Sequence, residues 1–214
     1  MLKVTGNISD NRIEGTNDPS CQLTVHWIGN SNVLRLGPNS QISGNITFWR
    51  SSQVVEFEGD NRFTLALAMK GAAASLSIGS GTRSNGLVQM NIGEWRDSIR
   101  IGKNCLFSRV RLRTSDSHGI FDRTSGARIN PSKPIVIGDE VWLAEEALVL
   151  KGANIGSGSV IGARSTVVGE LPEHSLCVGT PARAIRGDIR WTHSTVNEAH
   201  EKWVQWRRRR RPKA

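Results

Sequence analysis

The stretch from Ile137 to Pro172 decides the fold, because it divides without remainder into six hexapeptides: IGDEVW, LAEEAL, VLKGAN, IGSGSV, IGARST and VVGELP. The first position of every hexapeptide is aliphatic, and the fifth position is Ala or Ser in four of the six. A period of six fits neither an α-helix nor a hairpin strand, but it fits a short strand followed by a corner. Three such units make one triangular coil, and successive coils stack at about 4.8 Å. The stretch therefore predicts a parallel β-solenoid.

The N-terminal half carries a looser form of the same pattern. Aliphatic-Gly pairs recur at irregular spacing in Ile28-Gly29, Leu36-Gly37, Ile78-Gly79, Ile92-Gly93 and Ile101-Gly102. We therefore expect residues 1–190 to form one all-β solenoid domain. A β-sandwich with Ile-Gly turns is the alternative, and it competes more strongly over residues 28–106 than over residues 137–172.

The period fails over residues 113–134, a polar segment that contains Asp116, His118 and Asp122. A solenoid accommodates such an insertion by looping it out from a corner. Long loops on a rigid scaffold often carry functional residues. The segment, called the excursion below, is therefore the first place to look for a site.

The composition limits the functional classes. With 28 Lys+Arg against 19 Asp+Glu the formal charge is +9, which at first suggests a partner with many negative charges. Six of the cations lie within Arg207–Lys213, however, and subtracting them leaves +3 for the rest of the chain. The 22 glycines against 7 prolines favour turn-rich β structure.

Other classes find no support in the sequence. No run of 18 apolar residues is present, and Met1 is not followed by a signal-peptide core, so we expect a cytoplasmic protein. Cys21, Cys105 and Cys177 are odd in number and lack a CxxC pair, so we expect small buried residues, with neither disulfides nor a metal site. The motifs of common nucleic-acid-binding domains are also missing, and we expect no nucleic-acid partner.

Four features in order resemble one protein family. They are the excursion with His118, the Val141-Trp142 pair 24 positions after it, the hexapeptides, and the closing segment VGTPARAIR (178–186). Together they resemble the hexapeptide-repeat acyltransferases. Residues 116–122 and 126–131 are most similar to members that O-acetylate bacterial surface sugars, including capsular polysaccharide and sialic-acid capsules.

The resemblance implies several properties that the residue pattern alone does not. These are a left-handed coil, a homotrimer with active sites between neighbouring solenoids, acetyl-CoA as the donor and a glycan hydroxyl as the acceptor.

His118 is the candidate general base. A free alcohol is a poor nucleophile, and an imidazole suits removal of its proton as it attacks a thioester. Asp116 or Asp122 could fix the imidazole tautomer, or these carboxylates could bind sugar hydroxyls. A backbone carbonyl could equally be the orienting partner. The remaining histidines are expected to be structural or solvated; they are His26, His174, His193 and His200.

Trp142 is the second candidate catalytic residue. The resemblance implies that its indole packs beside the catalytic histidine and lines the acceptor or acyl channel. The alternative is a tryptophan that only caps a corner. Ala144 stands where relatives usually carry Gly, and Glu145 stands where they often carry a small residue.

CoA carries three phosphate groups, so its site should offer cations and exposed backbone amides. The resemblance implies that Ala144 and Ala163 lie against the pantetheine arm, that Thr180 shapes a turn, and that Arg183 and Arg186 meet the nucleotide end.

Residues 191–214 differ from the solenoid. A capping box over Thr195–Glu198 and the spacing of Ala199, Trp203 and Trp206 predict an amphipathic helix over residues 196–207. We expect its tryptophans to pack on the end of the solenoid. The arginine run is either a solvated tail or a segment that attracts an anionic polymer or the inner membrane surface.

The leading functional hypothesis is an acetyl-CoA-dependent O-acetyltransferase of a bacterial surface glycan. One alternative is N-acetylation of an amino-sugar nucleotide or another small acceptor. Another is a non-catalytic solenoid that binds polyanions through the basic tail. A β-helical metal hydratase is disfavoured because only His118 lies in the relevant loop.

Overall fold

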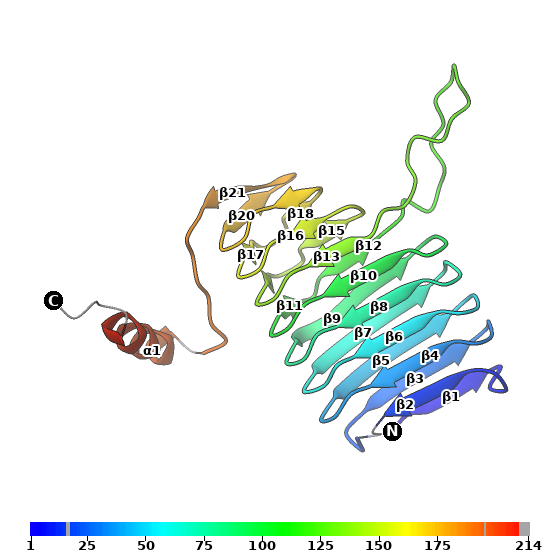
Figure 1. The fold of residues 1–214 in the computed structure, drawn as a ribbon, viewed down its shortest axis with the longest axis horizontal. Coiled ribbons are helices and arrows are strands. Elements are labelled where there is room, and N and C mark those ends of the chain that lie inside the picture. Colours follow the sequence, from blue (N-terminus) through cyan, green and yellow to red (C-terminus); the bar gives the residue numbers. More distant parts are fainter. Residues whose placement is uncertain (16–17, 195, 210–214) are drawn as a thin grey trace.

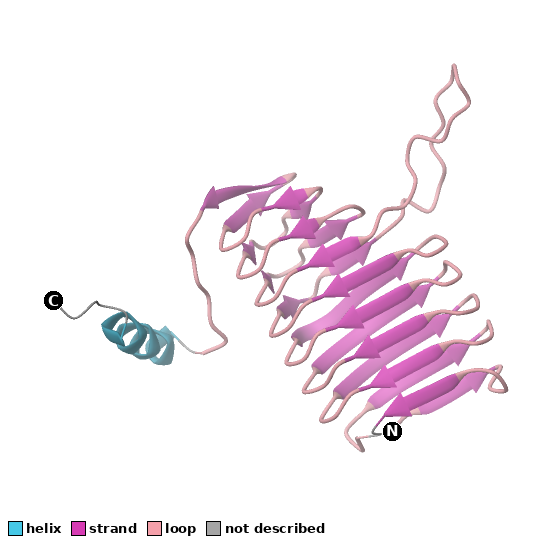
Figure 2. Cartoon of the chain, viewed as in Figure 1, coloured by secondary structure: helices cyan, strands magenta, loops and turns pink. Residues whose placement is uncertain are grey.

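A computed structural model describes residues 1–15, 18–194 and 196–209. These residues form a column of stacked strands with one helix beside it (Figures 1 and 2). The strands are β1 (Lys3–Gly6), β2 (Arg12–Gly15), β3 (Gln22–Trp27), β4 (Val33–Leu36), β5 (Gln41–Phe48), β6 (Val54–Phe57), β7 (Arg62–Met69), β8 (Ser75–Ile78), β9 (Arg83–Ile92), β10 (Ser98–Ile101), β11 (Leu106–Ser108), β12 (Arg111–Arg113), β13 (Ile135–Ile137), β14 (Trp142–Leu143), β15 (Leu148–Leu150), β16 (Asn154–Ile155), β17 (Val160–Ile161), β18 (Thr166–Val167), β19 (Glu170–Leu171), β20 (Leu176–Gly179) and β21 (Ala182–Arg186). The helix is α1 (Val196–Arg209).

The strands stack in parallel, coil upon coil. One sheet follows the order β19-β16-β13-β10-β8-β6-β4-β2, and the other contains the remaining strands. Within these sheets only the last pair, β20 with β21, is antiparallel. The protein is thus a left-handed parallel β-helix, as the hexapeptides and the family resemblance predicted.

The coils of the N-terminal half are longer than the hexapeptide coils, which explains the irregular spacing upstream. Val25 pairs with Ile46 and Ile46 with Leu67, so these coils take 21 residues, and the next takes 23 because Leu67 pairs with Met90. In the hexapeptide region Val149 pairs with Val167, so a coil takes 18. The N-terminal half therefore belongs to the same solenoid, and a β-sandwich is excluded.

The core follows from this difference in coil length. The first and fifth positions of the hexapeptides are buried, where small residues such as Ala147 and Ser165 suffice to fill the narrow coils. The 21-residue coils enclose more space and fill it with aromatic rings; the ring centroids of Trp27 and Phe48 are 4.3 Å apart. The three cysteines are buried and free as expected, and burial raises the pKa of Cys105 to about 12.

One corner of the solenoid positions the excursion. This corner follows β3, β5, β7 and β9, at residues 28–31, 49–52, 70–73 and 93–96. In the next coil the equivalent corner is expanded into the excursion, because β12 pairs with β9 and β13 pairs with β10. The excursion leaves after Arg113, returns before Ile135 and projects away from the column (Figure 1).

The C-terminal segment departs from one expectation. Helix α1 forms over the predicted residues, although Thr195 of the capping box lies outside the described residues. The helix lies beside the column rather than on its end (Figure 1), so the prediction of end packing is wrong. The physical reason is that β21 folds back and pairs antiparallel with β20. The edge of β20 at the end of the stack is therefore already covered. Residues 210–214 of the arginine tail lie outside the described residues. Of the helices in the described ranges, none combines the length and apolar character needed to cross a bilayer.

Candidate active site

His118 lies near the base of the excursion, on a backbone that Asn130 holds from both sides. The Asn130 Nδ2 donates to the His118 carbonyl oxygen at 2.8 Å and to Asp116 Oδ2 at 2.8 Å. The Asn130 Oδ1 accepts a hydrogen bond from the Ile120 amide at 2.6 Å. Because Asn130 is only 8% exposed, these bonds are shielded from water. The amide side chain therefore fixes the chain immediately before and after His118.

Lys151 attaches this loop to the solenoid. Its Nζ forms an ion pair with Asp116 and donates to the Asn130 carbonyl oxygen at 3.1 Å. The pKa of Asp116 is lowered, first by the hydrogen bond from Lys151 and then by that from Asn130. Lys151 comes near Asp116 because Leu150 pairs with Arg113 in the stack. The Asp116 carboxylate thus anchors the loop, and its hydrogen bonds do not go to the imidazole.

The His118 imidazole is exposed and has no hydrogen-bond partner within the described residues. The orienting group that we expected from Asp116 or Asp122 is therefore not supplied at its ring within one chain. Asp122 lies at the loop tip, where Oδ1 accepts bonds from the amides of Thr124 and Ser125 at 3.0 and 2.7 Å. These bonds, with that from the Ser125 hydroxyl, lower the pKa of Asp122.

A second ion pair holds the returning limb of the excursion. Arg128 donates to both carboxylate oxygens of Glu94, at 2.9 and 2.6 Å, and Ser115 Oγ donates to Glu94 at 2.9 Å. The bidentate geometry specifies orientation as well as attraction. The Arg128 guanidinium is the main cause that lowers the pKa of Glu94.

An open groove of about 580 Å³ lies beneath the excursion. Ser117 and Gly119, the two neighbours of His118, line its upper side. Its floor is the solenoid corner at Lys70, Gly93 and Trp95. The groove thus passes the residues on both sides of His118 and offers a surface that an acceptor could occupy.

Trp142 lies elsewhere on the same chain. Its ring packs against Trp191 of the C-terminal segment, with centroids 5.9 Å apart, and its Nε1 is buried without a partner in the described residues. Between β12 and β14 the chain passes through the excursion, strand β13 and one further corner. One chain therefore does not bring Trp142 beside His118.

The predicted CoA residues gather around β14 and the coils that follow it. Ala144 and Ala163 occupy neighbouring coils, because the Ala144 amide donates to Ile161 at 2.9 Å and the Arg164 amide donates to Glu145 at 2.8 Å. Within the described ranges the Ala163 amide has no acceptor, which fits a ligand amide contact. Glu145, the departure from the family pattern, forms an ion pair with Arg109 of the preceding coil.

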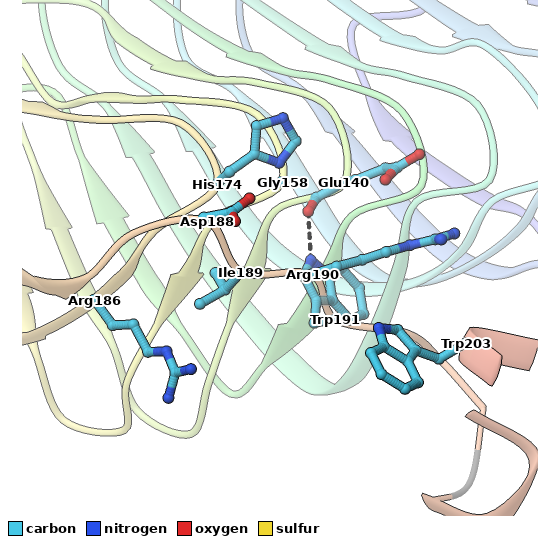
Figure 3. A pocket seen from close by; sticks show the side chains of 9 residues that line it. All are labelled: Glu140, Gly158, His174, Arg186, Asp188, Ile189, Arg190, Trp191 and Trp203. Carbon is cyan, nitrogen blue, oxygen red and sulfur yellow. Dashed lines mark hydrogen bonds between the residues drawn. The ribbon is translucent and has the colours of Figure 1, made fainter. Parts of the chain in front are cut away.

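The two predicted arginines separate along the last hairpin. Arg183 is exposed and pairs with Val178, whose side chain packs against Gly162. Thr180 begins the turn of this hairpin, in which the Thr180-Pro181 peptide bond is cis. Arg186 instead lines a cavity of about 830 Å³ (Figure 3).

Sequence reasoning did not anticipate this cavity. Residues 186–191 fold back along the corner at Glu140, Gly158 and His174, and Trp203 of α1 approaches from the far side (Figure 3). The Trp191 Nε1 donates to the Glu140 carbonyl oxygen at 2.5 Å. In the described part of the chain, no three His, Cys, Asp or Glu side chains are grouped to hold a metal ion.

Comparison with known proteins finds similar acetyltransferases. No family model matches the chain. The putative lipopolysaccharide biosynthesis O-acetyl transferase WbbJ of Escherichia coli K12 is 37% identical over 108 residues, which are 46% of this chain and 54% of that protein. The polysialic acid O-acetyltransferase of Neisseria meningitidis is 33% identical over 134 residues, 61% of this chain and 60% of that protein. The chain thus spans little more than half the length of these curated relatives.

A solved structure matches over nearly the whole length. The polySia specific acetyltransferase NeuO superimposes with a TM-score of 0.70 at 27% identity, covering 96% of this chain and 92% of that one. The chain is thus similar in sequence to named bacterial O-acetyltransferases, and its stacked coils match the fold of the polySia specific acetyltransferase NeuO.

Proposed function

We propose that the protein transfers acetyl from acetyl-CoA to a hydroxyl of a bacterial surface glycan, a capsular polysaccharide that contains sialic acid. The observation that carries this proposal is the exposed His118 imidazole, held on a rigid backbone beside an open groove. The relatives support the reaction class, since WbbJ is named as an O-acetyl transferase and the Neisseria protein as a polysialic acid O-acetyltransferase.

The chemistry requires one proton transfer in each direction. A His118 ring nitrogen removes the proton of the acceptor hydroxyl as its oxygen forms a bond to the thioester carbonyl carbon. When the tetrahedral intermediate collapses, the carbon–sulfur bond breaks and the imidazolium returns the proton to the CoA sulfur. Asp116 and Asp122 are proposed to present remaining carboxylate oxygens to sugar hydroxyls.

For the donor we propose a site along Ala144 and Ala163, with Thr180 shaping the turn below it. The small side chains leave room for the pantetheine arm, and the unpaired Ala163 amide offers a donor. Arg183 and Arg186 are exposed cations suited to the CoA phosphates.

We also propose a homotrimer in which Trp142 of one copy meets His118 of its neighbour. The separation of the two residues on one chain favours this arrangement. Its test is complementation between two inactive variants, His118→Ala and Trp142→Ala. Mixed trimers formed by co-expression should regain activity because some interfaces contain both intact residues. Failure to regain activity, with trimers formed, would place the two residues at one site within a single chain or at separate sites.

The test of the reaction itself is His118→Ala with acetyl-CoA and polysialic acid. Thiol release and acetylated product should fall at least about 100-fold, while acetyl-CoA binding, measured by calorimetry, stays within about twofold. Treatment of the product with mild alkali separates the alternatives, because an O-acetyl ester is cleaved and an N-acetyl amide is retained. Turnover near wild type in the variant would exclude His118 as the base.

We place the enzyme in the cytoplasm, with weak attachment to the inner membrane through α1 and the arginine tail. The cations of Arg207–Lys213 would meet anionic headgroups, and Trp203 is 42% exposed. Full-length protein should sediment with vesicles that contain phosphatidylglycerol, and a variant lacking residues 207–214 should not. Retained turnover of that variant on soluble acceptors would also exclude the non-catalytic polyanion-binding solenoid.

A further inference from the structure

The corner below the excursion differs in character from the other corner of the eight-stranded sheet. We call residues 28–31, 49–52, 70–73 and 93–96 the basic corner. It contains Arg50, Lys70 and Arg96, and its only acidic residue, Glu94, is paired with Arg128. The corner after β4, β6, β8, β10 and β13 instead carries Glu58, Asp60, Asp139 and Glu140. The two edges of one sheet are therefore oppositely charged.

Large side chains on the basic corner stand in line because the coils are in register. Trp27, Phe48, Met69 and Ile92 pair in sequence, so the residues that follow them also stack. That column is Ile28, Trp49, Lys70 and Gly93. Ile28 is 45% exposed and Trp49 is 47% exposed. The column spans three coil steps, about 14 Å, which is longer than a single sugar ring.

The column runs directly into the groove beside His118. Lys70 and Gly93 line the recess beside the excursion, which packs so closely here that a Cβ on Gly93 would lie 2.3 Å from Ser115 Cβ. Trp95 closes one side of the recess and is 67% exposed, with the Arg96 guanidinium 4.4 Å from its ring centroid. An exposed indole offers an apolar face that packs on sugar rings, and the cations pair with carboxylates.

We propose that the basic corner is a track that binds an anionic polysaccharide and leads its chain into the groove at His118. Trp49 and Trp95 pack on sugar rings, and Arg50, Lys70 and Arg96 pair with the carboxylates. This inference rests on the proposed function, and it specifies the acceptor as a polymer rather than a single sugar. The corner after β4, β6, β8, β10 and β13, which we call the acidic corner, repels the same polymer. The polysaccharide can therefore follow only one edge of the sheet.

The experiment compares wild-type protein with the double variant Trp49→Ala/Lys70→Ala. Both side chains are exposed and neither makes a hydrogen bond in the described structure, so the variant should fold. The matched control is Lys103→Ala, which removes one cation from the acidic corner. Direct binding is measured by calorimetry with polysialic acid, with disialic acid and with neutral dextran, at low and high salt.

We expect wild-type protein and Lys103→Ala to bind polysialic acid, more weakly at high salt, and not to bind dextran. The double variant should bind polysialic acid about tenfold more weakly. In turnover, its KM for polysialic acid should rise by the same factor while its KM for acetyl-CoA stays within about twofold.

Equal binding by the double variant and wild type would overturn the track while leaving the proposed reaction intact. Absence of polysialic acid binding by wild-type protein, or equal binding of dextran, would also overturn it. Polymer binding without any acetyl transfer would instead contradict the proposed function and leave the track standing.

Discussion

Asn130 Nδ2 lies 2.8 Å from the carbonyl oxygen of His118, so a side chain 12 positions later in the sequence fixes the backbone of the candidate base. The same amide group bonds to Asp116 and to the Ile120 amide. The imidazole owes its position to these backbone contacts, since its ring has no partner in the described chain. Under the proposed mechanism, the hydrogen bonds of Asn130 therefore position the base for proton transfer.

Replacing Asn130 by Ala should lower kcat about 10- to 100-fold, because a small displacement of the base misaligns it for proton transfer. The stability cost should be about 1–3 kcal/mol, from the buried groups that lose their partner. Steady-state kinetics and thermal unfolding measure the two effects. Ser125→Ala, which removes two hydrogen bonds at the loop tip, one to Asp122 and one from the Ala127 amide, is the control and should leave kcat unchanged. A kcat for Asn130→Ala within twofold of wild type would contradict the positioning role.

The attachment of the excursion should depend on pH. The folded state lowers the pKa of both Asp116 and Glu94. A lowered pKa means that the stabilisation is present above the ordinary carboxyl pKa and is lost as the pH falls through the folded value. Hydrogen exchange of residues 114–134, corrected for the intrinsic rate, should therefore accelerate below about pH 4.

Lys151→Met should move that acceleration to higher pH, because the main cause that lowers the pKa of Asp116 is removed. Hydrogen exchange followed by mass spectrometry gives the onset for each protein. Arg123→Gln, at the loop tip and without a carboxylate partner in the described chain, should show the wild-type onset. An unchanged onset in Lys151→Met would show that Asp116 does not hold the loop.

Gly44→Ala should be strongly destabilising. Gly44 has a φ of +109°, and a Cβ there would lie 1.9 Å from the carbonyl oxygen of Leu65 in the next coil. Since that atom is backbone, two coils would have to move apart, and we expect a loss of about 3 kcal/mol or more. Gly126→Ala is the matched control, with a φ of +70° and nothing within 4 Å, and should cost about 1 kcal/mol. Urea unfolding midpoints that do not differ between the two variants would contradict the close stacking.

Trp191→Ala should uncover the Trp142 indole, because the two rings pack with centroids 5.9 Å apart. In protein labelled with 5-fluorotryptophan, the Trp142 resonance should shift and become accessible to a paramagnetic quencher. Trp191→Phe retains a ring and should preserve most of the protection. The resonance can be assigned with Trp142→Phe. Protection that survives in Trp191→Ala would mean that other groups cover Trp142.

The hexapeptides allowed the C-terminal coils to be predicted residue by residue, because each repeat places the same kind of side chain at the same corner. For the N-terminal coils, only the solenoid architecture could be predicted, not the register of the strands. Their 21-residue length breaks the six-residue count, and the compensating change is in the size of core residues such as Trp27 and Phe48. A search for pairs of aliphatic residues 21 positions apart would have found them.

The sequence names a candidate base, His118, but it does not indicate the residues that hold its loop. His118 stands out because the repeat fails around it. Lys151 and Asn130 do not, since Lys151 reaches Asp116 only through the pairing of Arg113 with Leu150 across the stack. Trp142 was expected beside His118 because the resemblance implies that contact. One chain instead places Trp142 at a different edge, against Trp191, which no local pattern signals.

The consecutive 21-residue coils from β3 to β7 make the height of the N-terminal half adjustable. Duplicating one coil, such as residues 41–61, would add a strand to each sheet in register and leave the excursion, Asn130 and Lys151 in place. It would also lengthen the basic corner by one step of about 4.8 Å. Gain or loss of whole coils could therefore change the number of sugar units that bind along the basic corner, without altering the groups proposed to carry out the reaction.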